Sequence, residues 1–307
     1  MYVDGLFLKL KSSGLGCFIE DVFVGAFGYA DDLALLAPSL DALKAMIHIC
    51  EEYADAYKIL YNPKKSKLMY YNVHPSYDIC ITLSGSPVEV VTHETYLGNF
   101  IGTNIYERDI KSVVSGLYRR ANHVRADFGC IDCFTHYKLF STYCTNFYGS
   151  ELWNYNRSYI GDVFTAWRVL MRQVFKLPRR AHNFIVNGIC ESITIRLDRK
   201  LLKYLFNMIH STNITVCTIV DVLLKCKAST FDENYRYLNY KYKLCRDDWS
   251  CDLNVLINKI RSYSTISYDE RIIVDNVREL CSIRDDIYTT ELSKLEIQII
   301  IDALCIE

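Results

Sequence analysis

The chain has 307 residues, of which 50% are apolar and 23% are charged, a composition typical of a folded globular protein rather than a disordered or fibrous one. Its formal net charge of −1 argues against a uniformly basic nucleic-acid coat protein. The charge is uneven, however: residues 1–110 carry −6, residues 111–210 carry +9 and residues 211–307 carry −4. The positive charge of the middle third therefore indicates that this part of the chain binds an acidic partner.

The sequence contains no apolar run of the roughly 18 residues that a membrane span requires, and its first residues lack the pattern of a secretory signal. Its 13 cysteines are irregularly spaced, which is typical of reduced thiols. Cys130 and Cys133 lie close to His123 and His136, but no second pair follows at zinc-site spacing, so we interpret them as structural. We expect an intracellular protein, nuclear or cytoplasmic, that is neither secreted nor membrane-spanning.

Turn-forming residues concentrate at the front of the chain, where residues 1–102 hold eight of the 13 glycines and four of the five prolines. Apolar, β-branched and aromatic residues over 17–29 and 32–37 predict a hairpin that turns near Ala30 and Asp31. This part of the chain is therefore expected to form a small sheet.

A helix is predicted to cover that sheet. Ser39 is a favourable N-cap, and apolar residues at three- and four-residue steps predict an amphipathic helix over 40–58. Further short strands are predicted over 67–73, 78–83 and 88–102. The front of the chain is thus a sheet-with-helix layer that ends near residue 105, and the expected fold class of the whole chain is α+β.

From about residue 108 the apolar period becomes helical, and no Gly or Pro follows Gly188. The predicted helices cover residues 108–128, 134–149, 160–176, 190–211, 216–228, 267–284 and 290–305. A capping box, Ser267 to Glu270, opens the sixth of these, whereas the pattern over 229–265 is ambiguous. We expect three regions: 1–105 with the sheet, 106–190 as a helical bundle, and 191–307 as a helical region of unknown role.

The sharpest chemical feature is the string Tyr29-Ala30-Asp31-Asp32 at the predicted hairpin turn. Two adjacent carboxylates repel each other, and a divalent cation would relieve that repulsion. Mg²⁺ takes one or two carboxylates together with waters and substrate phosphates, which is the requirement of two-metal phosphoryl transfer. The plainer interpretation is a polar turn, because Asp favours turns.

Residues 27–39 resemble the palm motif of reverse transcriptases in the form typical of non-LTR (LINE-type) retrotransposons. Other segments are similar to elements of that family in order and spacing, over about residues 1–190. They are Gly14–Cys17 with Val24-Gly25 before the hairpin, Asn62–Ser66 after the helix, Tyr96-Leu97-Gly98 of a primer-grip hairpin, and Phe147–Trp153 with Leu177-Pro178 and His182 on the thumb side.

The resemblance implies a partial reverse transcriptase palm over 1–105, a thumb over 106–190 and two-metal nucleotidyl transfer. Its cofactor would be Mg²⁺, with Mn²⁺ as a substitute, and its partners an RNA template, a DNA primer and deoxynucleotide triphosphates. The implied roles are as follows: Asp31 as the principal metal ligand, Asp32 as the second carboxylate, Tyr29 against the primer–template backbone, Lys65 near the incoming triphosphate, and Tyr96, Leu97 and Gly98 in the primer grip.

The family's first catalytic Asp lies on an earlier palm strand, whereas only 30 residues precede Asp31 here and Asp4 is interpreted as a helix-start residue. We therefore expect that this chain by itself does not polymerise. Two alternatives stay open, namely a non-catalytic nucleic-acid-binding module and a decayed remnant of a retroelement.

The basic middle third fits the thumb of that resemblance. Arginines at helical spacing can follow phosphates without reading bases, although a solvated helix face is the plainer interpretation of each one. The predicted nucleic-acid-binding residues are Arg119, Arg120, Arg125 and Arg172, within a basic series that continues through Arg168, Lys176, Arg179 and Arg180.

Overall fold

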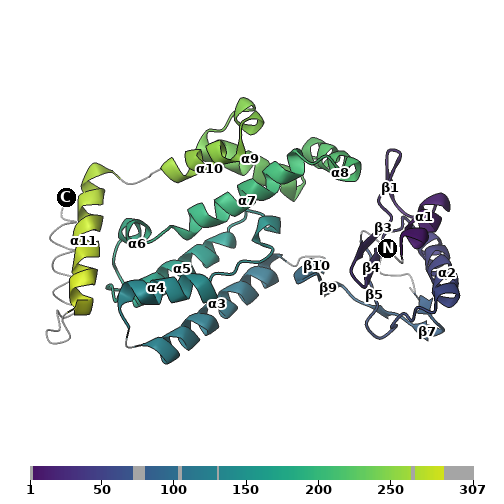
Figure 1. The fold of residues 1–307 in the computed structure, drawn as a ribbon, viewed down its shortest axis with the longest axis horizontal. Helices are drawn as coiled ribbons and strands as arrows, with labels where there is room; N and C mark the ends of the chain where they lie inside the picture. Colours follow the sequence, from purple (N-terminus) through teal and green to yellow (C-terminus); the bar gives the residue numbers. More distant parts are fainter. Residues whose placement is uncertain (1–2, 72–79, 103–105, 130, 264–266, 287–307) are drawn as a thin grey trace. The chain divides into compact units, whose positions relative to one another are not determined.

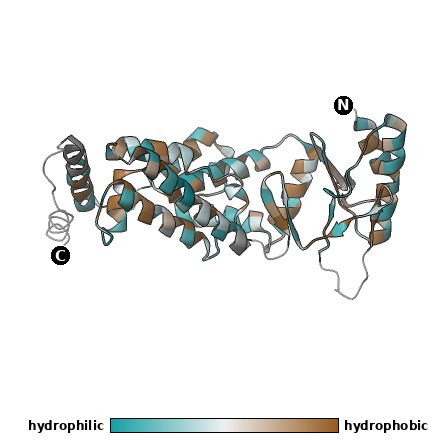
Figure 2. Cartoon of the chain, turned by 90° about the horizontal axis from the view of Figure 1, so that it is seen from below, coloured by the Kyte–Doolittle hydropathy of each residue, from teal (hydrophilic) through white to brown (hydrophobic). Residues whose placement is uncertain are grey.

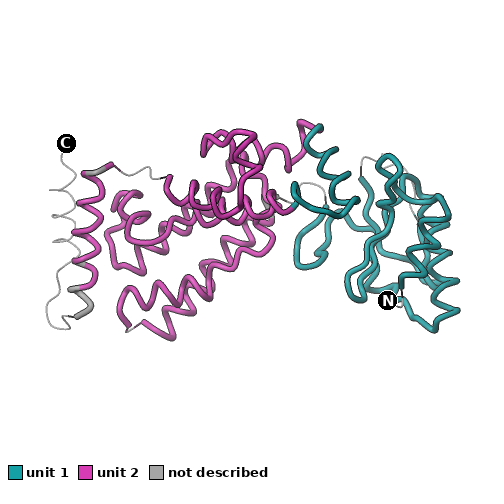
Figure 3. The backbone as a smooth tube through the Cα atoms, turned by 45° about the horizontal axis from the view of Figure 1, so that its top comes forward, with its two compact units in different colours: residues 1–105, 208–225 teal, residues 106–207, 226–307 magenta. Residues whose placement is uncertain are grey.

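The computed structural model describes residues 3–71, 80–102, 106–129, 131–263 and 267–286. The chain forms two units, residues 1–105 with 208–225, and residues 106–207 with 226–307 (Figures 1 and 3). The first unit contains the small sheets and the second is helical, so the described chain has both helices and strands, as the α+β class requires. Helix 216–228 was expected in the C-terminal region, but its counterpart α8 (Ile214–Lys225) belongs to the first unit.

The first unit has its core between α1 (Asp4–Ser12) and α2 (Leu40–Tyr57). The buried core residues are Leu6, Leu10, Met46, Cys50 and Tyr53, against which residues of the YADD hairpin pack, among them Ala26, Leu33 and Leu35. Each fully buried apolar side chain of this kind stabilises the folded state by about 1.5–3 kcal/mol. This apolar packing holds the hairpin to the two helices.

The predicted helix over 40–58 is confirmed. The Ser39 side chain accepts a hydrogen bond from the Ala42 amide at 3.2 Å, as expected of an N-cap, and Asp41 lies in the first turn. The helix ends at Lys58, which adopts a left-handed conformation with φ 59°.

The strands are shorter than the sequence predicts. The segment 17–29 is three strands, β1 (Phe18–Ile19), β2 (Val22–Phe23) and β3 (Ala26–Tyr29), and β3 pairs with β4 (Asp32–Leu35) around the predicted turn. Gly25 separates β2 from β3, where an added Cβ would lie 2.5 Å from the Phe23 ring. The remaining strands are β5 (Lys67–Leu68), β6 (Thr82–Leu83), β7 (Ser86–Pro87), β8 (Glu89–Val90), β9 (His93–Tyr96) and β10 (Asn99–Gly102). Part of the predicted strands 67–73 and 78–83 lies outside the described residues.

The second unit begins with the expected bundle. Its helices are α3 (Tyr106–Phe128), α4 (Cys133–Tyr143) and α5 (Ile160–Val174). The helices of this unit carry both hydrophobic and hydrophilic residues (Figure 2). The predicted helix 134–149 is wrong in its second half, because the chain leaves α4 after Tyr143 and Gly149 has φ 74°, which a helix interior does not allow. A short 3₁₀ helix, η1 (Ser150–Leu152), follows.

The predicted helix 190–211 is α7 (Ile193–Ile209), preceded by a separate helix α6 (Asn183–Ile189). The ambiguous segment 229–265 contains α9 (Thr230–Tyr242), the 3₁₀ helix η2 (Asp247–Ser250) and α10 (Leu253–Ser262). Helix α9 is anchored by polar contacts to the loop after α4, since the Asn234 side chain accepts from the Tyr155 amide at 2.9 Å and donates to the Trp153 carbonyl at 2.7 Å.

The final described helix, α11 (Tyr268–Asp286), begins with the predicted capping box: the Ser267 amide donates to Glu270 at 2.8 Å, and the Glu270 amide donates to the Ser267 hydroxyl at 3.3 Å. The predicted helix 290–305 and Cys130 lie outside the described residues. None of the helices described is both long and apolar enough to cross a membrane.

Substitution of Gly188 by alanine is expected to destabilise the packing of α11 on α6, because the new Cβ would lie 2.6 Å from both Cγ atoms of Val274. Such overpacking costs about 1–3 kcal/mol. Urea unfolding followed by tryptophan fluorescence measures this loss, since all three tryptophans, Trp153, Trp167 and Trp249, lie in the second unit.

The control for this prediction is Gly161→Ala on α5, where nothing lies within 4 Å of the added Cβ. This change is expected to leave stability unaltered or to raise it by up to about 1 kcal/mol. Adding Val274→Ala to Gly188→Ala should recover part of the loss. Equal stability of the Gly188→Ala and Gly161→Ala proteins would contradict the predicted clash.

Candidate active site

The string Tyr29-Ala30-Asp31-Asp32 (YADD in one-letter code) forms the tip of the β3–β4 hairpin. Tyr29 pairs with Asp32, so Ala30 and Asp31 make a two-residue turn. Ala30 has φ 54°, a left-handed conformation that costs a non-glycine residue roughly 1–2 kcal/mol. The first residues of the β1–β2 and β6–β7 turns, Glu20 and Ser84, have the same left-handed geometry with φ 52° and 50°, as two-residue hairpin turns require.

The two carboxylates at this tip are open to solvent. Asp31 and Asp32 are exposed, and within the described part of the chain neither side chain takes part in an ion pair or a hydrogen bond. Tyr29 is 65% exposed beside them. Two adjacent carboxylates without a partner are a donor set that fits Mg²⁺, which binds carboxylates and completes its shell with waters and phosphates.

The hairpin is supported from α1. An added Cβ at Gly28 would lie 2.8 Å from the Phe7 ring, so the hairpin and α1 are in contact at this position. Phe27 and Tyr29 flank Gly28 and point to the opposite face of the strand, where they are 39% and 65% exposed. Phe7 was not among the predicted site residues, since its only signal in the sequence is an aromatic side chain soon after the helix-start residue Asp4.

The β9–β10 hairpin lies close to this tip. Leu97 and Gly98 both have positive φ, 47° and 75°, which is the type I′ geometry of a two-residue turn and explains the glycine. Burial raises the pKa of the Tyr96 phenol, and the negative charge of Asp32 raises it further. Tyr96 is thus an electrostatic neighbour of Asp32, although the two lie 64 positions apart in the sequence.

Lys65 lies in a turn that Asn62 organises. The Asn62 side-chain oxygen accepts from the amides of Lys64 and Lys65 at 3.1 and 3.4 Å, and the Ser66 hydroxyl donates to the Asn62 carbonyl at 3.0 Å. These contacts explain why Asn and Ser stand at these positions. Lys65 is exposed, and no hydrogen bond or ion pair joins its ammonium to Asp31 or Asp32 among the residues described.

The predicted nucleic-acid-binding arginines divide into two kinds. Arg120 donates to the Cys144 carbonyl from Nε and Nη2, at 3.2 and 3.1 Å, and Arg172 donates to the Ala181 carbonyl from the same two atoms, at 3.0 and 2.7 Å. Both guanidinium groups therefore connect parts of the second unit. In both arginines the edge formed by Nε and Nη2 is directed at a carbonyl, and their role in nucleic-acid binding stays a prediction.

Arg119 and Arg125 are exposed. Arg119 has no partner among the described residues, and Arg125 donates to Asn122 at 2.9 Å and to Gln173 at 3.4 Å, both neutral groups. These two arginines keep an uncompensated positive charge at the surface of α3. Their surroundings are compatible with the predicted contact to phosphates.

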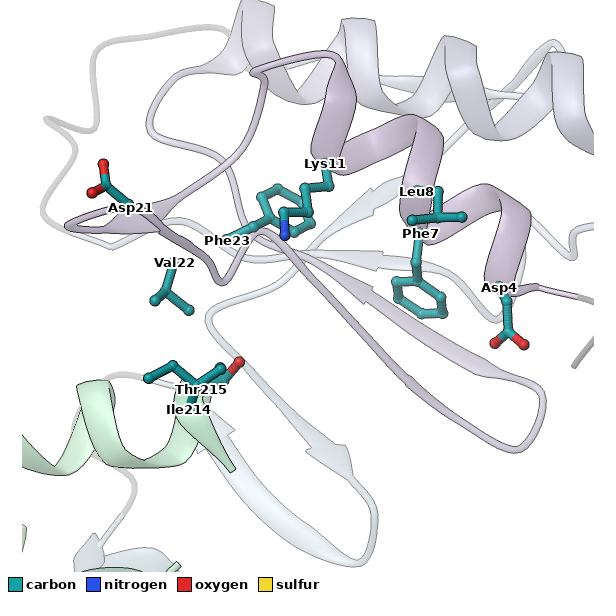
Figure 4. Close-up of a pocket in the computed structure, with 9 residues that line it drawn as sticks. All are labelled: Asp4, Phe7, Leu8, Lys11, Asp21, Val22, Phe23, Ile214 and Thr215. Atoms are coloured by element: carbon teal, nitrogen blue, oxygen red, sulfur yellow. The ribbon is translucent and has the colours of Figure 1, made fainter. Parts of the chain in front are cut away.

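A groove of about 550 Å³ lies elsewhere in the first unit, between α1, the β1–β2 hairpin and the first turn of α8. Its lining is mainly apolar, with Asp4 and Asp21 near its two ends and Lys11 between them, as Figure 4 shows. Asp4 is the first residue of α1 and exposed, in agreement with its interpretation as a helix-start residue. None of the predicted site residues lines this groove.

Within the described part of the chain no group of three or more His, Cys, Asp or Glu side chains could hold a metal ion. Asp31 and Asp32 are thus two carboxylates to which no third such side chain is added among these residues. Comparison with protein-family models, with curated proteins and with solved structures found no match.

Proposed function

We propose that the chain is part of a reverse transcriptase of the non-LTR retrotransposon type, with residues 1–105 as part of the palm and residues 106–190 as the thumb. The observation that supports it most is the arrangement of the YADD tip. Asp31 in the two-residue turn and Asp32 at the start of β4 are exposed carboxylates that have no ion pair or hydrogen bond among the described residues, and Tyr96 of the β9–β10 hairpin lies near Asp32. Positive φ at the first turn residue is common to the other two-residue hairpin turns of this unit, at Glu20, Ser84 and Leu97, so the support comes from the two open carboxylates and from Tyr96 beside Asp32.

In this proposal Asp31 and Asp32 hold Mg²⁺, which supplies charge stabilisation to the reacting phosphates when bound. Tyr29, exposed beside them, contacts the primer–template backbone, and the turn of Leu97 and Gly98 supports the primer end. Lys65 provides an ammonium for the triphosphate. The partners are an RNA template, a DNA primer and deoxynucleotide triphosphates.

Iron-directed cleavage tests the metal site without requiring activity. Fe²⁺ that replaces Mg²⁺ generates hydroxyl radicals with ascorbate and peroxide, and these radicals cut the backbone beside the bound ion. We expect cleavage within a few residues of Asp31, suppressed by excess Mg²⁺ and reduced about ten-fold or more in Asp31→Asn, since removing one of two carboxylates removes half of the site's charge.

The matched control is Asp21→Asn, an exposed aspartate on the turn between β1 and β2. This protein should be cut at Asp31 as efficiently as the wild type. Cleavage that is absent near Asp31, or equally strong in Asp31→Asn, contradicts the metal site. Primer extension on an RNA template then measures activity: the chain by itself is expected to give none, and extension that Asp31→Ala abolishes would overturn that expectation.

A second candidate function is non-catalytic nucleic-acid binding through the second unit. It is favoured by the exposed, uncompensated Arg119 and Arg125 and by the net charge of +9 over residues 111–210. Binding should then weaken steeply with salt, because it releases counterions, and Arg119→Glu with Arg125→Glu should weaken it further. Binding without salt dependence would exclude this role.

A further inference from the structure

A pair of arginines on α5 forms a basic cluster whose members differ in their contacts. Arg168 and Arg172 are four residues apart, so their side chains leave the helix on the same face. Both are partly buried, and two like charges in this arrangement destabilise a helix unless something offsets them.

Arg172 is held in one orientation by the loop that follows α5. Its Nε and Nη2 donate to the Ala181 carbonyl at 3.0 and 2.7 Å, and Nη2 also donates to the Asn183 side chain at 2.7 Å. Its acceptors are neutral, so the positive charge is not compensated. The N–H groups of Nη1 donate to none of the described residues.

Arg168 has no hydrogen bond and no ion pair with any described residue. Burial lowers the pKa of its guanidinium, and the pKa of Arg172 is lowered by burial and then by the charge of Arg168, with no carboxylate acting on either. Arg179 and Arg180, both exposed, directly precede the Ala181 carbonyl that orients Arg172 and add to the local positive charge.

Two partly desolvated guanidinium groups that keep N–H donors free and pair with no carboxylate among the described residues have the properties of an anion site. Guanidinium groups recognise phosphate through paired hydrogen bonds, and an oriented guanidinium loses less entropy on binding. We propose that Arg168 and Arg172 together bind a phosphate of a nucleic-acid backbone, with Arg172 oriented by Ala181 and Asn183. This inference rests on the proposed affinity of the chain for nucleic acid and adds Arg168, which was not among the predicted binding residues.

The test compares the full chain with its Arg168→Gln variant, using fluorescence anisotropy of a labelled RNA–DNA duplex at several KCl concentrations. Arg168→Gln should weaken binding about ten-fold at ~0.1 M salt and reduce the salt slope by about one. Arg168→Lys, which keeps the charge but not the paired donors, should bind with intermediate affinity.

Arg261→Gln is the matched control, because Arg261 is exposed near the end of α10 and has no partner among the described residues. It should change affinity less than two-fold. Equal losses in Arg168→Gln and Arg261→Gln would show general electrostatics and overturn the site, while leaving nucleic-acid binding by the chain intact.

A second measurement separates the site from the proposed function. Inorganic phosphate should raise the thermal unfolding midpoint of the wild type above that in KCl of equal ionic strength, and Arg168→Gln should lose this shift. If the shift is lost as expected but the wild type does not bind the duplex, the ligand is free phosphate and the nucleic-acid assignment is wrong. If phosphate stabilises both proteins equally, the anion site itself is wrong.

Discussion

Replacing Lys241 by methionine is expected to lower the free energy of unfolding of the second unit by about 3–5 kcal/mol, the usual cost of breaking a buried ion pair. Asp198 on α7 is fully buried. Its carboxylate accepts from the Lys241 ammonium at 2.5 Å, from Tyr242 at 2.6 Å and from Tyr237 at 3.2 Å. Without the ammonium, the buried carboxylate of Asp198 would keep only the hydrogen bonds from the phenols of Tyr237 and Tyr242 on α9.

The pKa of Asp198 explains why the loss is large. Burial raises this pKa, and the charge of Lys241 opposes the rise. Loss of Lys241 therefore leaves burial dominant, so the carboxylate should take up a proton at higher pH or remain as a costly buried anion. Either outcome lowers stability at neutral pH.

Urea unfolding followed by tryptophan fluorescence measures this change in the second unit. Lys203→Met is the control, since Lys203 is exposed on α7, the helix that carries Asp198, and should cost less than about 0.5 kcal/mol. Adding Asp198→Asn to Lys241→Met removes the unpaired charge and should recover part of the loss. A Lys241→Met protein as stable as Lys203→Met would refute the account.

Substitution of Arg120 by glutamine is expected to cost about 2–3 kcal/mol of stability, because two charged hydrogen bonds to the Cys144 carbonyl are lost. Cys144 is the C-cap of α4, where helix carbonyls lack partners within the helix and a positive charge is favourable. The expected signature is a lower urea midpoint.

Arg119→Gln is the matched comparison at the neighbouring position. It should leave the urea midpoint within the range of about 0.5 kcal/mol typical of surface changes, and weaken binding of an RNA–DNA duplex in a salt-dependent manner. Arg120→Gln and Arg119→Gln proteins that lose stability equally would contradict the separation of structural from exposed arginines.

Local patterns predicted the elements that depend on neighbours in sequence. The hairpin turn at Ala30 and Asp31, the N-cap at Ser39 and the capping box at Ser267 each involve residues within about four positions of each other, where side chain and backbone interact directly. The metal, the primer and the template are proposals that rest on the resemblance and on the open carboxylates of the tip.

The elements that the sequence predicted poorly depend on distant partners. Helix α9 lies in the segment whose period was ambiguous, because several of its buried positions are polar, among them Asn234, which bonds to the backbone of Trp153 and Tyr155. A hydrophobic pattern does not register such contacts. Their partners lie about 80 residues earlier in the chain.

The sequence by itself determined the change from strands to helices near residue 105, the acidic tip at Asp31 and Asp32, and the positive charge of the middle third. Only the tertiary structure decided which charges are available. Arg119 and Arg120 are neighbours in sequence, yet the helix turns them about 100° apart. One therefore faces water, while the other binds the Cys144 carbonyl. The two arginines differ because folding brings the Cys144 carbonyl within hydrogen-bond distance of Arg120 and not of Arg119. Neither the residue types nor their spacing in α3 predicts this contact.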